Sequence, residues 1–137
     1  MKKILLIDDS DTYTWCLQKY LQHRGYPVKT ACTLKEARTA IQEEMPLVVC
    51  CDLDLPDGSG MDFLDEVRAA DKELPFILAS CHDRDDYEQE AKRRGATLCM
   101  DKMKELLLQD KLVEYAYRQL SGEKAPTFHK LLFVYAE

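Results

Sequence analysis

Five short apolar runs recur along the chain, each separated from the next by a longer stretch of mixed polarity. The runs at residues 3–7, 47–51 and 75–80 are mainly apolar throughout, which is typical of parallel strands covered on both faces. Two further runs, at 27–31 and 97–100, complete the set. The pattern predicts five strands at these positions.

The stretches between the runs have the spacing of amphipathic helices. In the first stretch one stripe of positions is predicted to face the core: Tyr13, Cys16, Leu17, Tyr20 and Leu21. Thr33 followed by Glu36 has the capping-box pattern that begins a helix. Three further helices are predicted, over residues 60–70, 83–94 and 104–120.

Five strands in strict alternation with five helices predict an α/β domain with a parallel sheet. Right-handed crossovers bring the carboxyl ends of all the strands to one edge, where ligands bind in open α/β sheets. A chain of 137 residues is long enough for one such domain with a buried core. We assign this domain to residues 1–120.

Residues 121–137 fall outside the alternation. Ser121, Gly122 and Pro126 indicate a break after the last helix, yet the segment LLFVYA at 131–136 is too apolar for a solvated tail. Three interpretations stay open: the segment docks on the domain, pairs with another chain, or begins a linker to a further region.

Composition argues against several classes of protein. The net charge of −6 disfavours a surface that binds nucleic acid. No apolar run approaches the roughly 20 residues that span a bilayer, and the apolar stretch near the start is too short for a signal peptide. We therefore expect a cytoplasmic domain. The six cysteines show no C-x-x-C spacing, so a structural zinc site is not expected and they are predicted to be small buried hydrophobes.

Polar residues stand just past four of the predicted strands: Asp8 and Asp9, Asp52, Ser80, and Lys102. Since these strand ends share one edge, their side chains converge there. Crowded carboxylates repel one another, and a hard divalent cation such as Mg²⁺ relieves that repulsion. Lys102 and Ser80 are suited to surround a transferring phosphoryl group, which makes Asp52 a candidate nucleophile that accepts it.

The same residues resemble those of a known family. The segments LLIDDS (5–10), DLDLPDGSG (52–60) with its D-x-x-x-P-x-x-x-G spacing, PFILAS (75–80) and GATLCMDK (95–102) are similar to receiver domains of two-component response regulators. The resemblance covers residues 1–120. It implies a flavodoxin-like (βα)5 three-layer sandwich whose five-stranded parallel sheet has the strand order 2-1-3-4-5.

Carried over by position, the resemblance implies a phosphoacceptor and a metal site. Asp52 would accept the phosphoryl group. Asp9 and Asp52 would bind Mg²⁺ directly, together with the backbone carbonyl of Asp54, while Asp8 would act through a water molecule.

The resemblance also assigns roles around the acceptor. The Ser80 hydroxyl would turn toward a phosphoryl oxygen and Lys102 would pair with it, while Asp54 and His82 would flank the site and tune how fast the phosphoryl group is lost. A histidine kinase or phosphotransfer protein would donate the group, and the surface near the last two helices would change toward a downstream protein or an output domain. A second copy of the chain is a further candidate partner. Such a domain is not a turnover enzyme.

Two positions depart from the family pattern. Cys99 stands where the family usually has Tyr or Phe, and Met103 stands where it usually has a proline after a cis peptide bond. A cis bond before a non-proline residue costs about 2.5–4 kcal/mol, so we expect a trans bond and a reshaped loop. Trp15 points away from the predicted apolar stripe, so we expect it to be exposed and a candidate contact for the phosphodonor.

Two alternatives stay open. Haloacid-dehalogenase-type phosphatases also use D-x-D with Mg²⁺, but there D-x-D follows the first strand, whereas here it lies in mid-chain. The second alternative is a receiver-like module that binds or dimerises without phosphorylation, which Cys99, Met103 and the apolar tail favour.

Overall fold

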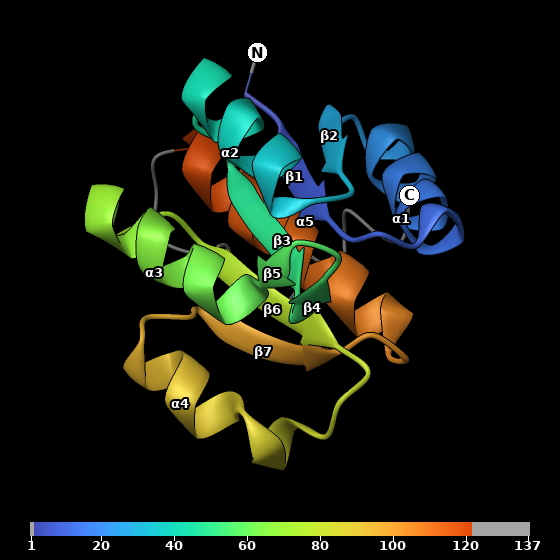
Figure 1. Cartoon of the computed structure of the whole chain (residues 1–137). Coiled ribbons are helices and arrows are strands. Elements are labelled where there is room, and N and C mark those ends of the chain that lie inside the picture. The colour runs from blue at the N-terminus through green and yellow to red at the C-terminus, as the bar shows by residue number, and fades with distance from the viewer. Residues whose placement is uncertain (1, 122–137) are drawn as a thin grey trace.

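The computed structural model describes residues 2–121, which form a parallel sheet with helices on both faces (Figure 1). The predicted tail, apart from Ser121, lies outside the described residues. The strands of the main sheet are β1 (Ile4–Ile7), β2 (Val28–Ala31), β3 (Val48–Asp52), β6 (Phe76–Ser80) and β7 (Leu98–Asp101). The helices are α1 (Asp11–His23), α2 (Leu34–Glu43), α3 (Gly60–Ala70), α4 (Glu88–Arg93) and α5 (Glu105–Ser121), with a short 3-10 helix η1 (Arg84–Asp86) before α4.

The sheet has the order β2-β1-β3-β6-β7 and every pairing in it is parallel. This is the predicted order 2-1-3-4-5, and the α/β prediction is confirmed. From β1 the chain continues into β2, toward one edge of the sheet. From β3 it continues into β6, toward the opposite edge. The carboxyl ends of β1 and β3 therefore border the point where the winding reverses, which is where α/β sheets bind ligands.

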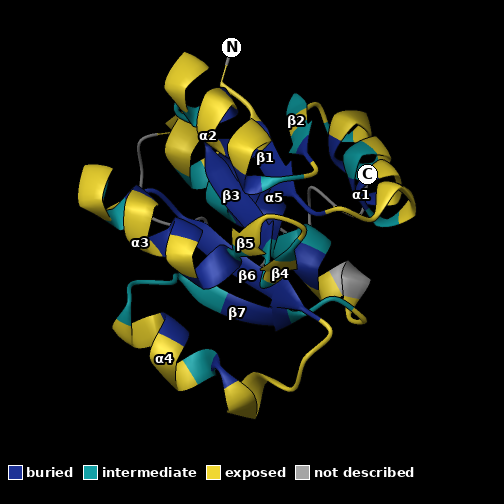
Figure 2. Cartoon of the chain, in the orientation of Figure 1, coloured by how far each residue is buried: buried dark blue, intermediate teal, exposed yellow. Residues whose placement is uncertain are grey.

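Alternate residues of each strand enter two separate cores, because side chains on a strand alternate between faces. Leu5 and Ile7 belong to a cluster completed by α2, α3 and α4, whereas Ile4 and Leu6 belong to a cluster completed by α1 and α5. Figure 2 shows the buried strands between helices whose outer faces are exposed. The result is the three-layer sandwich that the resemblance implies.

The predicted stripe of α1 is wrong at one position. Cys16 is exposed, and Thr14 is buried in its place. Burial of Thr14 costs little because its hydroxyl donates to the backbone carbonyls of Ser10, at 3.0 Å, and Asp11, at 3.2 Å. The prediction for the cysteines is half right: the buried ones are Cys50, Cys51 and Cys99, and the exposed ones are Cys16, Cys32 and Cys81.

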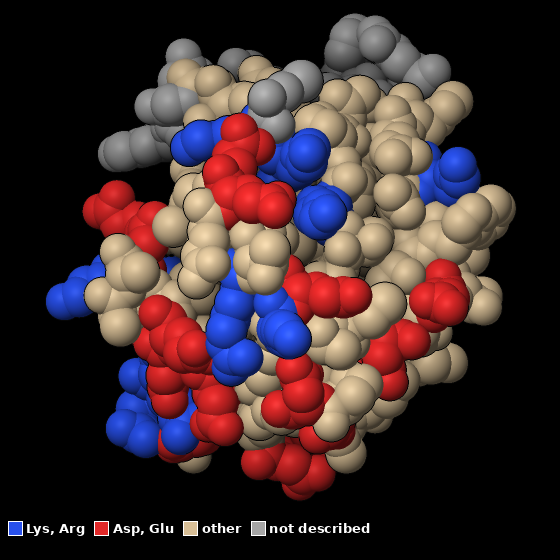
Figure 3. Space-filling view, turned by 45° about the horizontal axis from the view of Figure 1, so that its top comes forward, with Lys and Arg blue, Asp and Glu red and all other residues tan. Residues whose placement is uncertain are grey.

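Acidic and basic side chains are interspersed on the face drawn in Figure 3, which shows no broad surface of one sign. Part of this mixture is paired, as in the two-pronged contact of Arg38 on α2 with Glu66 on α3, at 2.9 and 3.0 Å. Among the described residues, no helix combines the length and the hydropathy needed to cross a bilayer.

Candidate functional site

The carboxyl edge of the sheet gathers polar residues from four strands. Asp8 directly follows β1, Asp52 ends β3, Ser80 ends β6 and Lys102 directly follows β7. The register keeps the strand ends level, since Asp52 pairs with Ala79 and Ser80 pairs with Asp101. Four segments far apart in sequence thus end at one place.

Three carboxylates form a cluster at this edge. Asp8, Asp9 and Asp52 each offer an oxygen atom, and these three atoms lie within 4.8 Å of one another. Asp8 is buried, Asp52 is half-buried and Asp9 is exposed, so the cluster opens to solvent on one side. Clustered carboxylate oxygens are the donor set that hard divalent cations prefer.

The electrostatics of Asp52 reflect this crowding. Burial, and then the neighbouring charge of Asp8, raise the pKa of the Asp52 carboxyl above its ordinary 3.8. The Lys102 charge and the backbone N–H groups of Asp54 and Leu53 oppose this rise in pKa without cancelling it. Negative charge on Asp52 is therefore less favourable here than in water, which is the condition that a bound cation relieves.

The Lys102 ammonium provides positive charge beside the carboxylate cluster. Its Nζ atom lies 2.5 Å from Asp8 Oδ2 and 3.5 Å from Asp52 Oδ2, and only 11% of its side chain is exposed. Burial lowers the pKa of Lys102, but its hydrogen bond to Asp8 and the charges of Asp8 and Asp52 outweigh burial, so the pKa is raised. The ammonium is charged at neutral pH.

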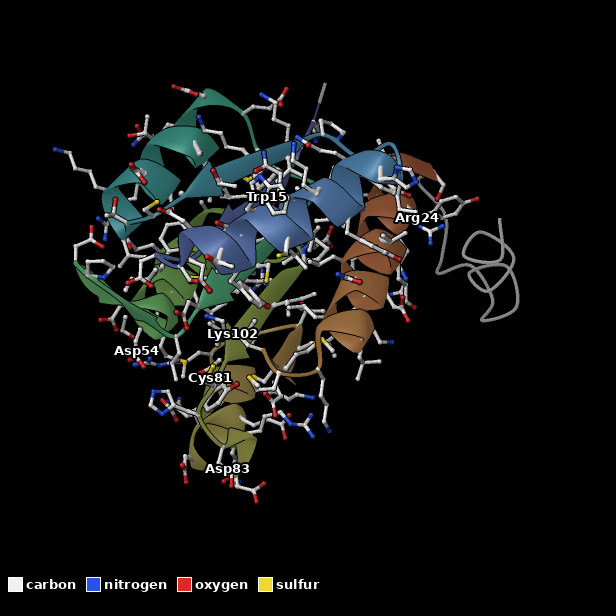
Figure 4. All side chains as sticks on the ribbon, turned by 90° about the vertical axis from the view of Figure 1, so that its right-hand side faces the viewer. Trp15, Arg24, Asp54, Cys81, Asp83 and Lys102 are labelled. Atoms are coloured by element: carbon white, nitrogen blue, oxygen red, sulfur yellow. The ribbon has the colours of Figure 1, made fainter. Side chains whose placement is uncertain are left out.

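The rim of the site is formed by the segment after β6. Ser80 is buried, and its Oγ accepts a hydrogen bond from the backbone N–H of His82 at 3.0 Å. The His82 ring pairs with the Asp54 carboxylate at 2.5 Å, and both side chains are exposed. The Asp54 side chain is therefore engaged at the rim and lies outside the carboxylate cluster. Figure 4 shows Asp54 and Cys81 at this end of the molecule, with Lys102 nearby.

The loop after Asp52 explains the D-x-x-x-P-x-x-x-G spacing. A small hairpin that the sequence patterns did not predict, β4 (Asp54–Leu55) with β5 (Gly58–Ser59), carries the chain from β3 back to α3. At its end a Cβ on Gly60 would stand 2.2 Å from the backbone oxygen of Asp52. Only glycine lets helix α3 begin this close to the strand end.

Asp57 also has a role that sequence reasoning did not assign. From the tip of the hairpin its carboxylate accepts hydrogen bonds from the backbone N–H groups of Leu34, at 2.8 Å, and Lys35, at 3.1 Å. These are among the first N–H groups of α2, which have no partner inside the helix. The hairpin is thus fastened to α2 as well as to α3.

The two departures from the family pattern lie in β7 and just after it. Cys99 is buried in the same cluster as Tyr87, and burial raises the pKa of its thiol to about 11. Met103 is 79% exposed, follows a trans peptide bond as expected, and donates its N–H to the Asp101 carboxylate at 2.8 Å. A proline at this position has no N–H to donate. Trp15 is 59% exposed, as expected.

Comparisons with known proteins agree with this geometry. The family described as response regulator receiver domain matches residues 4–113. The chain is 29% identical over 91 residues to the regulatory protein LuxO of Vibrio vulnificus, a stretch that is 66% of this chain and 20% of LuxO. It therefore spans about a fifth of that relative.

Solved structures give the same result. The receiver domain of NtrX from Brucella abortus aligns with a TM-score of 0.75 and 28% identity, over 88% of this chain and 100% of that one. A CheY-like receiver domain protein from Methanospirillum hungatei aligns with a TM-score of 0.79 over 90% of this chain and 99% of that one; at 22% identity it supports the fold alone.

Proposed function

Because the chain belongs to the response regulator receiver domain family, we propose that Asp52 accepts a phosphoryl group and that this step controls the binding of a partner. One observation carries the choice of Asp52 over Asp8. Asp8 is 4% exposed and is already bound by Lys102 and by the backbone N–H of Ser10, at 2.9 Å. Asp52 lies beside the same ammonium at 3.5 Å and retains solvent access, so a donor can reach it.

In the proposed step an Asp52 carboxylate oxygen attacks the phosphorus of a phosphohistidine on a sensor kinase or phosphotransfer protein. The new bond is P–O, and the P–N bond breaks with its electron pair left on the imidazole. Asp52 becomes an acyl phosphate, which later hydrolyses. Since the domain itself is the acceptor, this is not turnover of an external substrate.

The donor set fits Mg²⁺. Three carboxylates face one ammonium, so the cluster keeps an excess of negative charge. Asp9, Asp52 and the backbone carbonyl of Asp54 would hold the ion directly, and Asp8 would act through a water molecule. When bound, Mg²⁺ supplies charge neutralisation for the transferring phosphoryl group.

The remaining side chains act on the product. Lys102 would exchange its contact with Asp8 for a phosphoryl oxygen, and the Ser80 hydroxyl would donate to another. Both are buried or nearly so, and charge-assisted hydrogen bonds are strong in such surroundings. Asp54 and His82 at the rim would tune the access of the water that hydrolyses the acyl phosphate.

The signal would pass to a downstream protein, to an output domain or to a second copy of the chain through the surface near α4, β7 and α5. A second candidate function is a receiver that binds without phosphorylation. Cys99 favours it, since β7 lacks the aromatic side chain that the family usually has at this position.

The test is intact mass after incubation with acetyl phosphate and Mg²⁺. We expect a gain of one phosphoryl group in the wild type, loss of the gain in Asp52→Asn, and loss on chelation of Mg²⁺. Asp62→Asn, which removes an exposed carboxylate from α3, is the matched control and should keep the gain. No gain in the wild type, together with partner binding that is indifferent to phosphodonors, would favour the second candidate.

A further inference from the structure

We infer that Tyr13 is a positioning residue for Lys102: its ring holds the ammonium beside Asp52 while the phosphoryl group is transferred. This inference rests on the proposed function. The Lys102 Nζ atom lies 4.5 Å from the centroid of the Tyr13 ring, within the range in which an aromatic face attracts a cation. From its spacing on α1, Tyr13 is predicted only to be a core residue, and nothing in the sequence indicates the contact with Lys102.

The place of Tyr13 is fixed through Asp8 itself. The Asp8 carboxylate accepts the Ser10 N–H at 2.9 Å, and the Ser10 hydroxyl, as N-cap of α1, accepts the Tyr13 N–H at 3.3 Å. The first turn of α1 is thereby tied to the carboxylate that pairs with Lys102. Asp8 and the Tyr13 ring thus come from one short segment and contact the same ammonium.

The ring contact matters most when Asp8 releases Lys102. In the proposed step Asp8 would turn to the metal site, so Lys102 would lose its 2.5 Å partner and keep only the longer 3.5 Å contact with Asp52 until it gains a phosphoryl oxygen. An ammonium in a site with little solvent needs a favourable contact during that exchange. An aromatic face provides one without a negative charge that would compete with the phosphoryl group. Contacts of this kind correspond to about 3- to 30-fold in a rate.

A matched control separates this role from packing. Tyr20 lies on the same helix, is half-buried and packs against the same core cluster as Tyr13. The cation over the Tyr20 ring is the guanidinium of Arg24, whose Cζ atom lies 5.3 Å from the ring centroid, and not Lys102. Tyr20→Leu therefore removes a similar aromatic ring without touching the site.

The experiment compares initial rates of phosphoryl gain from acetyl phosphate and Mg²⁺ in four chains. We expect Tyr13→Leu to slow the gain by about 3- to 30-fold, Tyr13→Phe to retain most of the rate because it keeps the ring face, and Tyr20→Leu to match the wild type. Equal rates in Tyr13→Leu and the wild type, or equal losses in Tyr13→Leu and Tyr20→Leu, would overturn the inference.

A second readout does not depend on phosphorylation. The methylene protons beside the Lys102 ammonium, assigned in NMR spectra by their absence in Lys102→Met, should be shifted upfield by the ring in the wild type and in Tyr13→Phe. The shift should vanish in Tyr13→Leu and persist in Tyr20→Leu. An upfield shift with no phosphoryl gain in the wild type would overturn the proposed function and the role of Tyr13 in it. A normal gain without the shift would overturn the Tyr13 contact alone.

Discussion

The carboxylate of Asp57 caps a helix that begins 23 residues earlier in the chain, accepting the Leu34 N–H at 2.8 Å. This hydrogen bond lowers the pKa of Asp57 from its ordinary 3.8, with a further N–H from Lys35 acting in the same direction. The loop that follows Asp52, the candidate phosphoacceptor, is therefore attached to α2 by the carboxylate of Asp57.

We predict that Asp57→Ala lowers the melting temperature by a few degrees at pH 7. A folded-state pKa below the unfolded value means that the ionised carboxyl stabilises the fold above pH 3.8, and that this contribution is lost as the pH falls through the lowered pKa. The gap between wild type and variant, followed by circular dichroism, should shrink in acid. A gap that grows in acid would contradict the capping role.

Asp52→Asn should have the opposite effect. Burial and the charge of Asp8 raise the pKa of Asp52, so the folded chain holds this proton more tightly than the unfolded chain. That contribution to stability is complete below pH 3.8 and is lost as the pH rises through the raised pKa. Without Mg²⁺ at pH 7, we expect the variant to melt a few degrees above the wild type, and the two to converge below pH 3.8. A wild type that melts higher at pH 7 would refute the electrostatic crowding.

Gly60→Ala should damage the site itself. The new Cβ would stand 2.2 Å from the Asp52 backbone oxygen, so the strand end must move, at a cost of about 1–3 kcal/mol in the free energy of unfolding. We expect slower phosphoryl gain as well. The control is Gly25→Ala, where φ is +90° but no atom lies within 4 Å of the added Cβ. That variant should lose stability and keep its rate of phosphoryl gain.

Tyr87→Phe should leave the stability unchanged or raise it by up to about 1 kcal/mol. The Tyr87 hydroxyl is buried and has no hydrogen-bond partner within the described part of the chain, so its removal saves a desolvation cost. The ring itself packs in the core with Ala91 and Cys99. Tyr87→Ala should therefore cost about 3–5 kcal/mol. Urea unfolding of the two variants measures both values, and a clear loss in Tyr87→Phe would reveal a hidden partner of the hydroxyl.

The sequence predicts the meeting of Asp8, Asp52, Ser80 and Lys102 because parallel strands deliver their carboxyl ends to one edge, whatever the details of packing. It does not predict the contact of Tyr13 with Lys102, since an aromatic residue in a helical stripe has the same pattern whether it faces aliphatic groups or an ammonium. The capping role of Asp57 is hidden for another reason: its partners are backbone N–H groups, which carry no residue signature.

Local errors have similar causes. Cys16 and Thr14 are both compatible with the edge of an apolar stripe, and the burial of Thr14 depends on two backbone carbonyls that its hydroxyl reaches. The helix predicted over 83–94 is interrupted near Tyr87, where η1 ends and α4 begins. Its N-terminal half is too polar to show from periodicity alone where regular helix starts.

The contact between Lys102 and Asp8 has a mechanical consequence. In the order β1-β3-β6-β7, two strands separate the strand before Asp8 from the strand before Lys102. With neighbouring strands about 4.8 Å apart, the backbones that carry the two residues are about 14 Å apart across the sheet. The ion pair therefore links the two strand ends across the sheet, in addition to the pairing of β7 with β6, its one neighbour in the sheet. We expect any event that separates Lys102 from Asp8 to remove this link. A chemical change at the centre of the carboxyl edge would then alter the position of the chain at the end of β7, the outermost strand.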